Sequence, residues 1–250
     1  MIILKLGGSA ITKKSGYMQA DMGSIARLAA VVGKACKSGV RGLVIVHGAG
    51  SFGHAPVLKY GLQNGVRTAA QKKGCRITQG ACAKLSSNVV HALLQNGVGA
   101  VSIAPHGIVK SKGGRIAKLN KAPITRALSR SAVPVLYGDM VPDSLLGFSV
   151  CSGDQIVAHL GKRAKFIVLA TNVDGVLVHS KVVPQITRRN FAQVSRHLSG
   201  SAHPDVTGGM AGKMKEVMRT GKRAFIVNAK KPSRVLALLL GKQAVCTRIN

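Results

Sequence analysis

The chain has 250 residues, of which 46% are hydrophobic, and 37 lysines and arginines against 7 aspartates and glutamates give it a formal net charge of +30. This length is sufficient to bury one α/β core, or two closely joined lobes. No apolar run reaches the roughly 18 residues that a membrane-spanning helix needs, which excludes a membrane protein of that kind. Five scattered cysteines without a Cys-x-x-Cys pair argue against a disulfide framework or a zinc site.

The same composition bears on compartment and partners. Reduced thiols, and a chain that begins directly with a predicted strand rather than a signal peptide, predict a cytoplasmic protein. Aromatic residues make up 3% of the chain and tryptophan is absent. Base stacking needs aromatic platforms, so we expect no specific nucleic-acid partner. We expect no membrane partner either, because no apolar run is long enough to span a membrane. The positive field attracts anions in general, and a non-catalytic polyanion-binding protein stays an alternative.

Predicted strands and helices alternate along the chain. Apolar runs predict strands at 2–6, 43–46, 98–104, 133–137, 166–170, 224–228 and 244–249. Helical periodicity and end signals predict helices at 24–38, 77–96, 123–131, 154–163 and 211–220. We also expect a flap or hairpin over 60–76, a hairpin over 107–121, and an irregular stretch over 182–204 with one short helical piece. This order predicts an α/β protein with a mainly parallel sheet and right-handed crossovers.

A lysine interrupts the first predicted strand. Lys5 follows three apolar residues and precedes the turn Gly7-Gly8-Ser9. An ammonium group in a buried strand is costly unless it reaches an anion. The adjoining glycine turn favours a phosphate contact over a side chain that merely extends to the surface.

The second predicted strand runs directly into a glycine-rich turn. Leu43 to Val46 are apolar, and His47-Gly48-Ala49-Gly50-Ser51-Phe52-Gly53-His54 follows. Glycines allow backbone N–H groups to approach an anion, and the start of the next helix adds its positive end to the attraction. We interpret this turn as a cradle for a phosphate-bearing substrate, with His54 one turn into the helix.

The cradle also fits the dinucleotide fingerprint G-x-G-x-x-G. That fingerprint requires an acidic residue about 20 positions further on to hold a ribose hydroxyl. No Asp or Glu occurs between Asp21 and Asp139. Arg67 or Arg76 could instead read a 2′-phosphate, so this alternative is weakened but stays open.

Acidic residues are rare and several stand beside glycines. Asp139, Asp154 and Asp174 each adjoin a glycine near the predicted end of a strand or the start of a helix. Aspartate and glycine are both common in turns, which is the simplest explanation. Strand ends are also where open α/β sheets bind ligands. At Asp154 we expect the carboxylate to cap the following helix.

Five ordered motifs resemble the amino acid kinase superfamily. They are Lys5-Leu6-Gly7-Gly8-Ser9, the cradle ending in Gly53-His54, Ser152-Gly153-Asp154, Asn172-Val173-Asp174-Gly175, and Asp205-Val206-Thr207-Gly208-Gly209-Met210-Ala211-Gly212-Lys213. The resemblance covers essentially the whole chain. It implies a three-layer αβα sandwich, a single domain over 1–250, and a homodimer. It further implies an acceptor-binding lobe over about 1–150 and a nucleotide-binding lobe over about 151–250.

Within this superfamily, the segment Gly50-Ser51-Phe52-Gly53-His54 resembles the isopentenyl phosphate kinase branch, because other branches usually lack a histidine at this position. That branch transfers the γ-phosphoryl group of ATP, with Mg²⁺, to isopentenyl phosphate, and gives isopentenyl diphosphate and ADP. Because two polyanions must meet in line, positioning and charge neutralisation carry most of such catalysis. The alternative is a kinase of the same fold that acts on another phosphate or phosphonate, such as fosfomycin. The fosfomycin kinase has the same histidine after its cradle.

The resemblance also implies roles for individual residues. The implied catalytic residues are Lys5, Lys14, His54, Asp154 and Lys213. The implied acceptor-binding residues are Ala49, Gly50, His54, Gly138 and Gly153. The implied ATP-binding residues are Lys5, Gly7, Gly8, Ser9, Gly50, Thr171, Asp174, Gly209 and Lys213, and no side chain is assigned as a metal ligand.

The sequence departs from the family pattern at two positions. Ala49 replaces the usual middle glycine of the cradle, which is tolerated only where φ stays negative. Lys13 replaces a residue that is often acidic, and its effect on Lys14 stays open. Thr78, Gly80 and Ala81 either leave a slot for an apolar tail or mark tight helix packing, and the sequence does not distinguish these.

Overall fold

A computed structural model of the chain describes residues 1–13, 16–198 and 209–250. Its main sheet has eight strands in the described part, in the order β12-β14-β13-β9-β1-β2-β6-β3. These strands are β1 (Ile2–Leu6), β2 (Leu43–His47), β3 (Ala100–Ser102), β6 (Val133–Tyr137), β9 (Phe166–Thr171), β12 (Gln185–Ile186), β13 (Ala224–Asn228) and β14 (Thr247–Ile249). All pairs are parallel except β13 with β14. The predicted mainly parallel sheet is confirmed.

Strand β1 joins the two halves of the chain. It pairs in parallel with β2 on one side and with β9 on the other, so that Lys5 lies opposite both Val46 and Leu169. Every residue of β2, and most of β1 and β9, is buried. Such uniformly apolar strands are expected where helices cover both faces of a parallel sheet.

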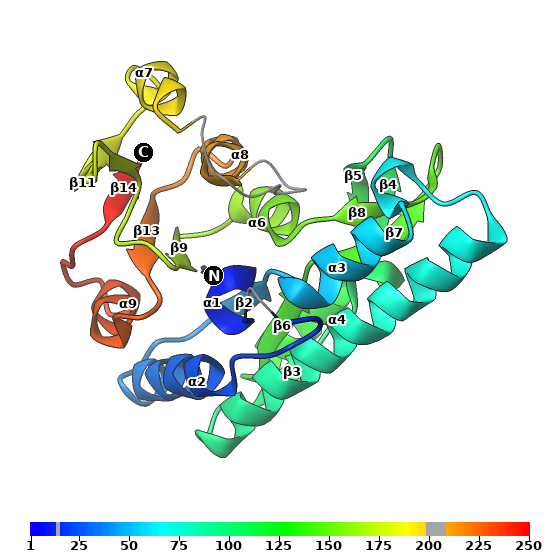
Figure 1. The fold of residues 1–250 in the computed structure, drawn as a ribbon. Coiled ribbons are helices and arrows are strands. Elements are labelled where there is room, and N and C mark those ends of the chain that lie inside the picture. The colour runs from blue at the N-terminus through cyan, green and yellow to red at the C-terminus, as the bar shows by residue number, and fades with distance from the viewer. Residues whose placement is uncertain (14–15, 199–208) are drawn as a thin grey trace.

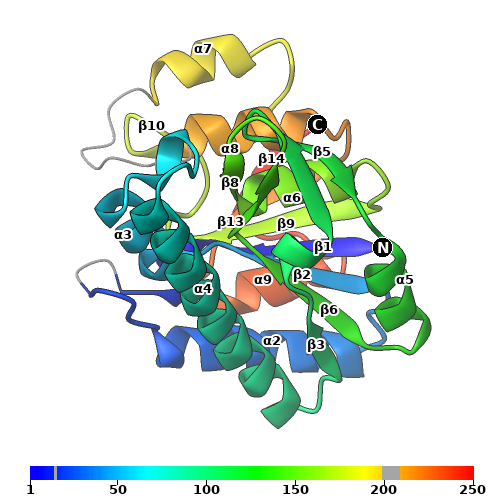
Figure 2. The same ribbon diagram turned by 90° about the vertical axis from the view of Figure 1, so that its right-hand side faces the viewer.

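Helices cover both faces of this sheet and complete three layers (Figures 1 and 2). One face carries α2 (Met22–Lys37), α4 (Ala69–Gln95) and α9 (Pro232–Leu239), whose apolar residues share one core. The other face carries α5 (Ala122–Ser129), α6 (Gly153–Gly161), α7 (Phe191–Arg196) and α8 (Gly209–Met218), whose apolar residues share a second core. The fold is therefore the predicted αβα sandwich.

A smaller antiparallel sheet packs beside the main one. Its order is β5-β4-β7-β8, with β4 (Val109–Lys112), β5 (Arg115–Leu119), β7 (Asp139–Asp143) and β8 (Gly147–Cys151). The hairpin β4–β5 turns at Gly113 and Gly114 as predicted. Sequence reasoning missed the hairpin β7–β8, and it also missed the two-stranded ribbon of β10 (Leu177–Val178) and β11 (Lys181–Val182).

The predicted flap or hairpin over 60–76 is wrong. It contains the short 3₁₀ turn η1 (Leu62–Asn64) and the first two turns of α4, which begins at Ala69. Thr68 caps this helix, and its side chain and that of Gln71 form a reciprocal capping box. This box supplies the start signal that the polar sequence hides from a search for apolar periodicity. Helix α9 was also missed, although Pro232 stands in its first turn, where proline is favoured.

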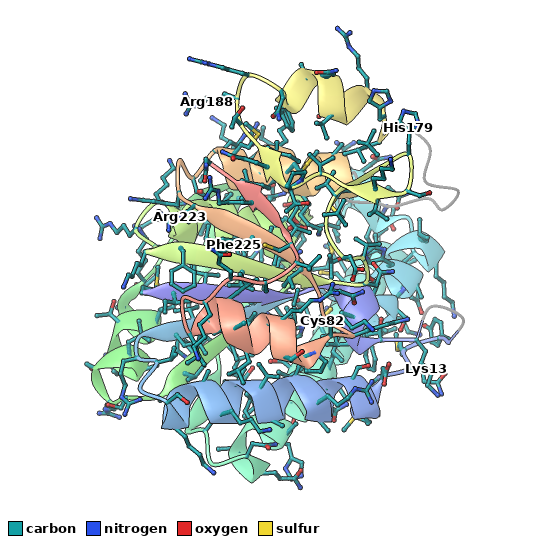
Figure 3. The ribbon with its side chains drawn as sticks, turned by 90° about the vertical axis from the view of Figure 1, so that its left-hand side faces the viewer. Lys13, Cys82, His179, Arg188, Arg223 and Phe225 are labelled. Carbon is teal, nitrogen blue, oxygen red and sulfur yellow. The ribbon has the colours of Figure 1, made fainter. Side chains whose placement is uncertain are left out.

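The basic residues are distributed over the molecule. Lys13, Arg188 and Arg223 come from distant segments and lie at different edges in Figure 3. The two remaining short helices, α1 (Gly8–Ile11) and α3 (Ser51–Lys59), follow β1 and β2 directly. Among the described residues, no helix combines the length and the apolar character that crossing a membrane requires.

Candidate active site

A cavity of about 600 Å³ opens where the central parallel strands end. Turns after β1, β2, β6 and β9, together with the starts of α6 and α8, supply much of its wall. The carboxyl ends of β1, β2 and β9 lie at one edge of the sheet because these strands are parallel. This is the edge at which open α/β sheets bind ligands.

Two glycine turns meet backbone to backbone in this wall. A Cβ atom on Gly8 would lie 2.5 Å from the amide nitrogen of Gly50, and one on Gly48 would lie 2.6 Å from that of Gly8. Gly50 has φ of +51° at the N-terminal cap of α3. Side chains at these positions would separate the turns or strain the backbone. The glycines predicted to form the cradle are therefore required for the close approach itself.

Three charged side chains meet in the cavity. The Lys5 ammonium nitrogen lies 2.7 Å from Asp154 Oδ1, and the Lys213 ammonium nitrogen lies 3.4 Å from Asp154 Oδ2. Lys5 comes from β1, Asp154 from α6 and Lys213 from α8. The structure thus brings together three of the predicted catalytic residues from widely separated parts of the sequence.

Burial and the mutual charges shift the titration of this cluster. Burial lowers the pKa of Lys5 to about 8, although the nearby Asp154 carboxylate opposes that change. For Asp154, burial raises the pKa, but the ammonium groups of Lys5 and Lys213 outweigh burial and lower it to about 2. At neutral pH the cluster therefore carries two positive charges and one negative charge. The excess positive charge faces a cavity suited to an anion.

The expected capping role of Asp154 is wrong. Ser152 is the N-terminal cap of α6, and its hydroxyl accepts a hydrogen bond from the Gln155 amide. Asp154 stands in the first turn instead and turns its carboxylate to the two lysines. A serine cap leaves the carboxylate free for this contact.

The cradle side of the cavity contains the expected acceptor residues. Ala49, Gly50, His54, Gly138 and Gly153 all line it. Ala49 is absent from the described residues with positive φ, so alanine is tolerated there as predicted. His54 is half-buried on α3, whose N-terminal cap is Gly50. This region combines the His54 imidazole, which can donate to a phosphate, with the turn Gly48-Ala49-Gly50. The amides of residues 51–54 at the start of α3 already donate to partners within the protein.

One end of the cavity is apolar. Val57, Thr78, Cys82, Met140 and Val150 line it. Of the predicted tail slot, only Thr78 faces the cavity. Ala81 packs into the core beneath α4, and a Cβ on Gly80 would meet open space. Cys82 lies in the interior of the molecule (Figure 3), where burial raises its pKa well above that of a free thiol. Sequence reasoning missed the four apolar residues because their strands and helices are far apart in the chain.

The nucleotide-side predictions divide into three groups. Gly7, Gly8, Ser9, Thr171 and Gly209 line the cavity. Asp174 does not. Its carboxylate accepts hydrogen bonds from Asn228 and Arg234 at 2.8 and 2.9 Å. Lys14 and residues 205–208 of the last motif lie outside the described residues.

Two further groups, to which the sequence assigned no role in the site, line the cavity. Thr12 lines the cavity, and its hydroxyl donates to the Gly8 carbonyl and accepts from the Ser51 amide, which ties the two glycine turns together. Asp139 also lines the cavity, and its buried carboxylate accepts from the His106 ring at 2.7 Å. Burial raises the pKa of Asp139. The contacts of Thr12 with Ser51 and of Asp139 with His106 span 39 and 33 positions, and contacts over such distances leave no local sequence signal.

Residues 1–228 match the profile of the Amino acid kinase family. The chain belongs to this family, whose membership implies ATP as the phosphoryl donor. An isopentenyl phosphate kinase from Methanothermobacter thermautotrophicus is 38% identical over 100% of this chain and 99% of its own. One from Methanocaldococcus jannaschii is 32% identical over 97% of this chain and 96% of its own. A solved isopentenyl phosphate kinase structure superimposes with a TM-score of 0.85 at 34% identity, over 100% of both chains.

Proposed function

We propose that this protein transfers the γ-phosphoryl group of ATP to isopentenyl phosphate, giving isopentenyl diphosphate and ADP. A phosphate oxygen of the acceptor attacks the γ-phosphorus, the bond from that phosphorus to the β-phosphate bridging oxygen breaks, and ADP leaves with the bonding electrons. The acceptor oxygen is already anionic, so the step requires no side-chain base. Positioning and charge neutralisation are what the protein supplies.

The observation that carries this proposal is the shape of one cavity. It joins a glycine cradle with His54 to an apolar end, and the Lys5–Asp154–Lys213 cluster lies in the same wall. A short ester of phosphate with a branched hydrocarbon needs both features: donors for its head and apolar contact for its tail. The identity of 38% over the full chain to an isopentenyl phosphate kinase supports the same substrate.

Each region then has one task. The cradle holds the acceptor phosphate with backbone N–H groups and His54, while Val57, Met140 and Val150 contact the hydrocarbon. The first glycine turn and the start of α8 hold ATP. Lys5 and Lys213 supply positive charge to the transferring group. Asp154 contacts both lysines, so its carboxylate positions their ammonium groups and reduces the repulsion between them. Positive charge set in advance around a developing anion is the main source of catalysis in such sites.

The donor set fits Mg²⁺ that arrives with ATP. Asp154 is committed to two lysines and Asp139 to a histidine, so the carboxylates that line the cavity already have cationic or hydrogen-bonding partners. Mg²⁺ keeps several waters and is often held by substrate phosphates with few protein ligands. When bound, it neutralises charge on the β- and γ-phosphates.

The lobe roles follow from the same proposal. The cradle and apolar end come mainly from residues before 150, and the start of α8 and the turn after β9 come from residues after 150. This division supports an acceptor-binding N-terminal lobe and a nucleotide-binding C-terminal lobe within a single domain. Homodimerisation and a cytoplasmic location remain predictions from the sequence.

Acceptor screening tests the proposal. Purified protein with MgATP is offered isopentenyl phosphate, dimethylallyl phosphate and fosfomycin, and ADP release is measured beside ³¹P NMR of the product. We expect the highest kcat/KM with isopentenyl phosphate and a new diphosphate signal. Turnover of fosfomycin alone would replace our proposal with the phosphonate alternative, which the apolar end of the cavity does not favour. Tight RNA binding without ATP turnover would instead support a polyanion-binding protein.

Replacing His54 with alanine should lower kcat/KM for isopentenyl phosphate more than tenfold. The change removes a hydrogen bond to a charged phosphate, a type of contact worth about 1.5–3 kcal/mol. Steady-state kinetics with varied acceptor at saturating ATP measures the effect, and the KM for ATP should change little. His91→Ala is the matched control, because His91 is exposed on α4 outside the cavity. Unchanged acceptor kinetics in His54→Ala would contradict the role.

Acceptor kcat/KM should also fall as the pH rises above about 8. Lys5 acts as an ammonium ion, and its pKa of about 8 means that the free protein loses this charge as pH rises through that value. The dependence of kcat/KM on pH reports groups of the free enzyme. A basic limb near pH 8 is expected in the wild type. A profile that stays flat to the ordinary lysine pKa would show that Lys5 keeps its proton or does not act.

A further inference from the structure

A second recess lies away from the catalytic cavity. It has a volume of about 850 Å³ and is enclosed by the hairpin β4–β5, the 3₁₀ turn η2 (Pro105–Gly107), the start of α5 and the end of α6. Its lining shares no residue with that of the catalytic cavity. Figure 2 shows β5 and α5 toward the edge where the chain begins, and α3, which carries His54, toward the opposite edge.

The recess is strongly basic. Six of its thirteen lining residues carry an ammonium, guanidinium or imidazole group, and none carries a carboxylate. These six are His106, Lys110, Lys118, Lys121, His159 and Arg163. Within residues 1–13, 16–198 and 209–250, no ion pair joins a carboxylate to any of the three lysines or to Arg163. Like charges gathered without counter-charges repel one another, and a bound anion relieves that repulsion.

The pKa of the half-buried His159 on α6 is lowered by its burial and by nearby positive charges. Burial lowers the pKa of His159, and the positive charges of Lys121 and Lys162 lower it further. On the opposite side, the His106 ring contacts Asp139 through Nδ1 at 2.7 Å, which fixes the ring at the rim of the recess. Two imidazoles and four cationic side chains therefore line one recess, and they come from η2, the hairpin β4–β5, the start of α5, and α6 with the segment after it.

The walls also restrict what the recess can hold. Ile108, Val109, Leu119 and Pro142 give it apolar surface between the charges. Its aromatic rings are the two imidazoles, so it offers no tryptophan, tyrosine or phenylalanine on which bases could stack. A compact anion with several negative charges matches this lining better than a nucleic-acid strand does.

We propose that this recess is a second anion site, which binds a small phosphorylated molecule of the diphosphate class. Lys110 and Lys118 come from the hairpin, while Lys121 and Arg163 come from the start of α5 and the segment after α6. These four cations share the diphosphate charge. The proposal does not rest on the function of the catalytic cavity. It gives the basic lining of this hairpin a ligand instead of leaving it as part of the general surface charge.

Inorganic pyrophosphate is the probe, and histidine NMR of the full chain separates the two sites. His159 reports the recess, while His54 reports the catalytic cavity, which also attracts pyrophosphate. His106 is not used as a reporter, because its ring contacts Asp139 in the wall of the catalytic cavity. In the wild type, pyrophosphate should shift the His159 resonances and raise the pKa of His159. The double variant Lys110→Ala/Lys118→Ala should weaken the apparent Kd read at His159 about tenfold. The His54 response should stay unchanged.

Lys34→Ala/Lys37→Ala is the matched control. It removes two exposed positive charges from the last turn of α2, so it changes the net charge equally and leaves the recess intact. We expect less than about a twofold change in its Kd at His159. Equal weakening in both double variants would show a general charge effect and overturn the proposal. Absence of any His159 shift at millimolar pyrophosphate, or displacement of pyrophosphate by a single-stranded RNA at lower concentration, would overturn it as well.

Discussion

Replacing Lys5 with methionine is expected to lower kcat about a thousandfold, the upper range for loss of one preorganised electrostatic group. Methionine keeps the length and apolar stem of the side chain but removes the ammonium charge. That charge lies at the end of the buried central strand, 2.7 Å from Asp154 Oδ1. Because the negative charge of the transferring group develops at this place, its loss should reduce kcat more than the KM for either substrate.

The measurement is steady-state kinetics with circular dichroism of the same preparations. The fold should persist, since a neutral side chain avoids the cost of burying a charge and Asp154 keeps Lys213 as a partner. Lys165→Met is the control, because Lys165 is exposed just before β9. A Lys5→Met protein with a native spectrum and near wild-type kcat would refute the catalytic role of this ammonium group.

Replacing Asp154 with asparagine is expected to lower kcat about a hundredfold and to move the basic limb of the pH profile to lower pH. The carboxylate favours the charged form of Lys5, so its removal lowers the pKa of Lys5 below the wild-type value of about 8. The Lys213 ammonium then repels Lys5 without compensation. More of Lys5 is neutral at pH 7, and less positive charge remains for the transferring group.

The shift of the pH limb distinguishes positioning from a merely structural role, because a loosened fold would lower kcat without moving that limb. Asp21→Asn is the control. Asp21 accepts from the Ser24 amide as the N-terminal cap of α2, so that variant affects stability but leaves the cavity intact. An Asp154→Asn protein whose basic limb stays near pH 8 would contradict the proposed coupling between these two residues.

Asp154 also links stability to acid. Its pKa of about 2 lies below the value near 3.9 of an unfolded aspartate, so the stabilisation is complete above pH 4. It is lost as the pH falls from about 4 toward 2, where the folded carboxylate also becomes protonated. The unfolding free energy of the wild type should therefore fall in this window, and the pH dependence of the Asp154→Asn unfolding free energy should be weaker there.

Local patterns were sufficient for the elements that carry the glycine turns. Lys5 precedes the turn Gly7-Gly8, and an apolar strand precedes the cradle. These two patterns predicted the edge of the sheet at which the cavity lies, and a phosphate as its ligand. The pairing of Lys5 with Asp154 joins residues 149 positions apart, and Lys213 lies 59 positions beyond Asp154. Their meeting depends on the crossovers that bring α6 and α8 over the end of β1, which no local spacing encodes.

The errors had equally specific causes. The first turns of α4 are polar and their start is marked by Thr68 and Gln71 instead of apolar periodicity. The hairpin β7–β8 follows β6 almost without a break, so one apolar stretch divides between two sheets at Gly138. Asp139 and His106 then meet across that division. Asp154 was misassigned as a cap because Ser152, two residues earlier, satisfies the helix end.

In the proposed reaction, the contact between the two glycine turns fixes how the two substrates approach each other. Gly8 and Gly50 touch through main-chain atoms, and Thr12 bridges the same two segments. In the proposed reaction one turn belongs to the donor and the other to the acceptor. The distance between the γ-phosphorus and the attacking phosphate oxygen is thus set by the main chain of the two turns. Movements of side chains leave this distance unchanged. Substitutions that reshape the apolar end can therefore alter which alcohol phosphate is accepted while the line of attack is preserved.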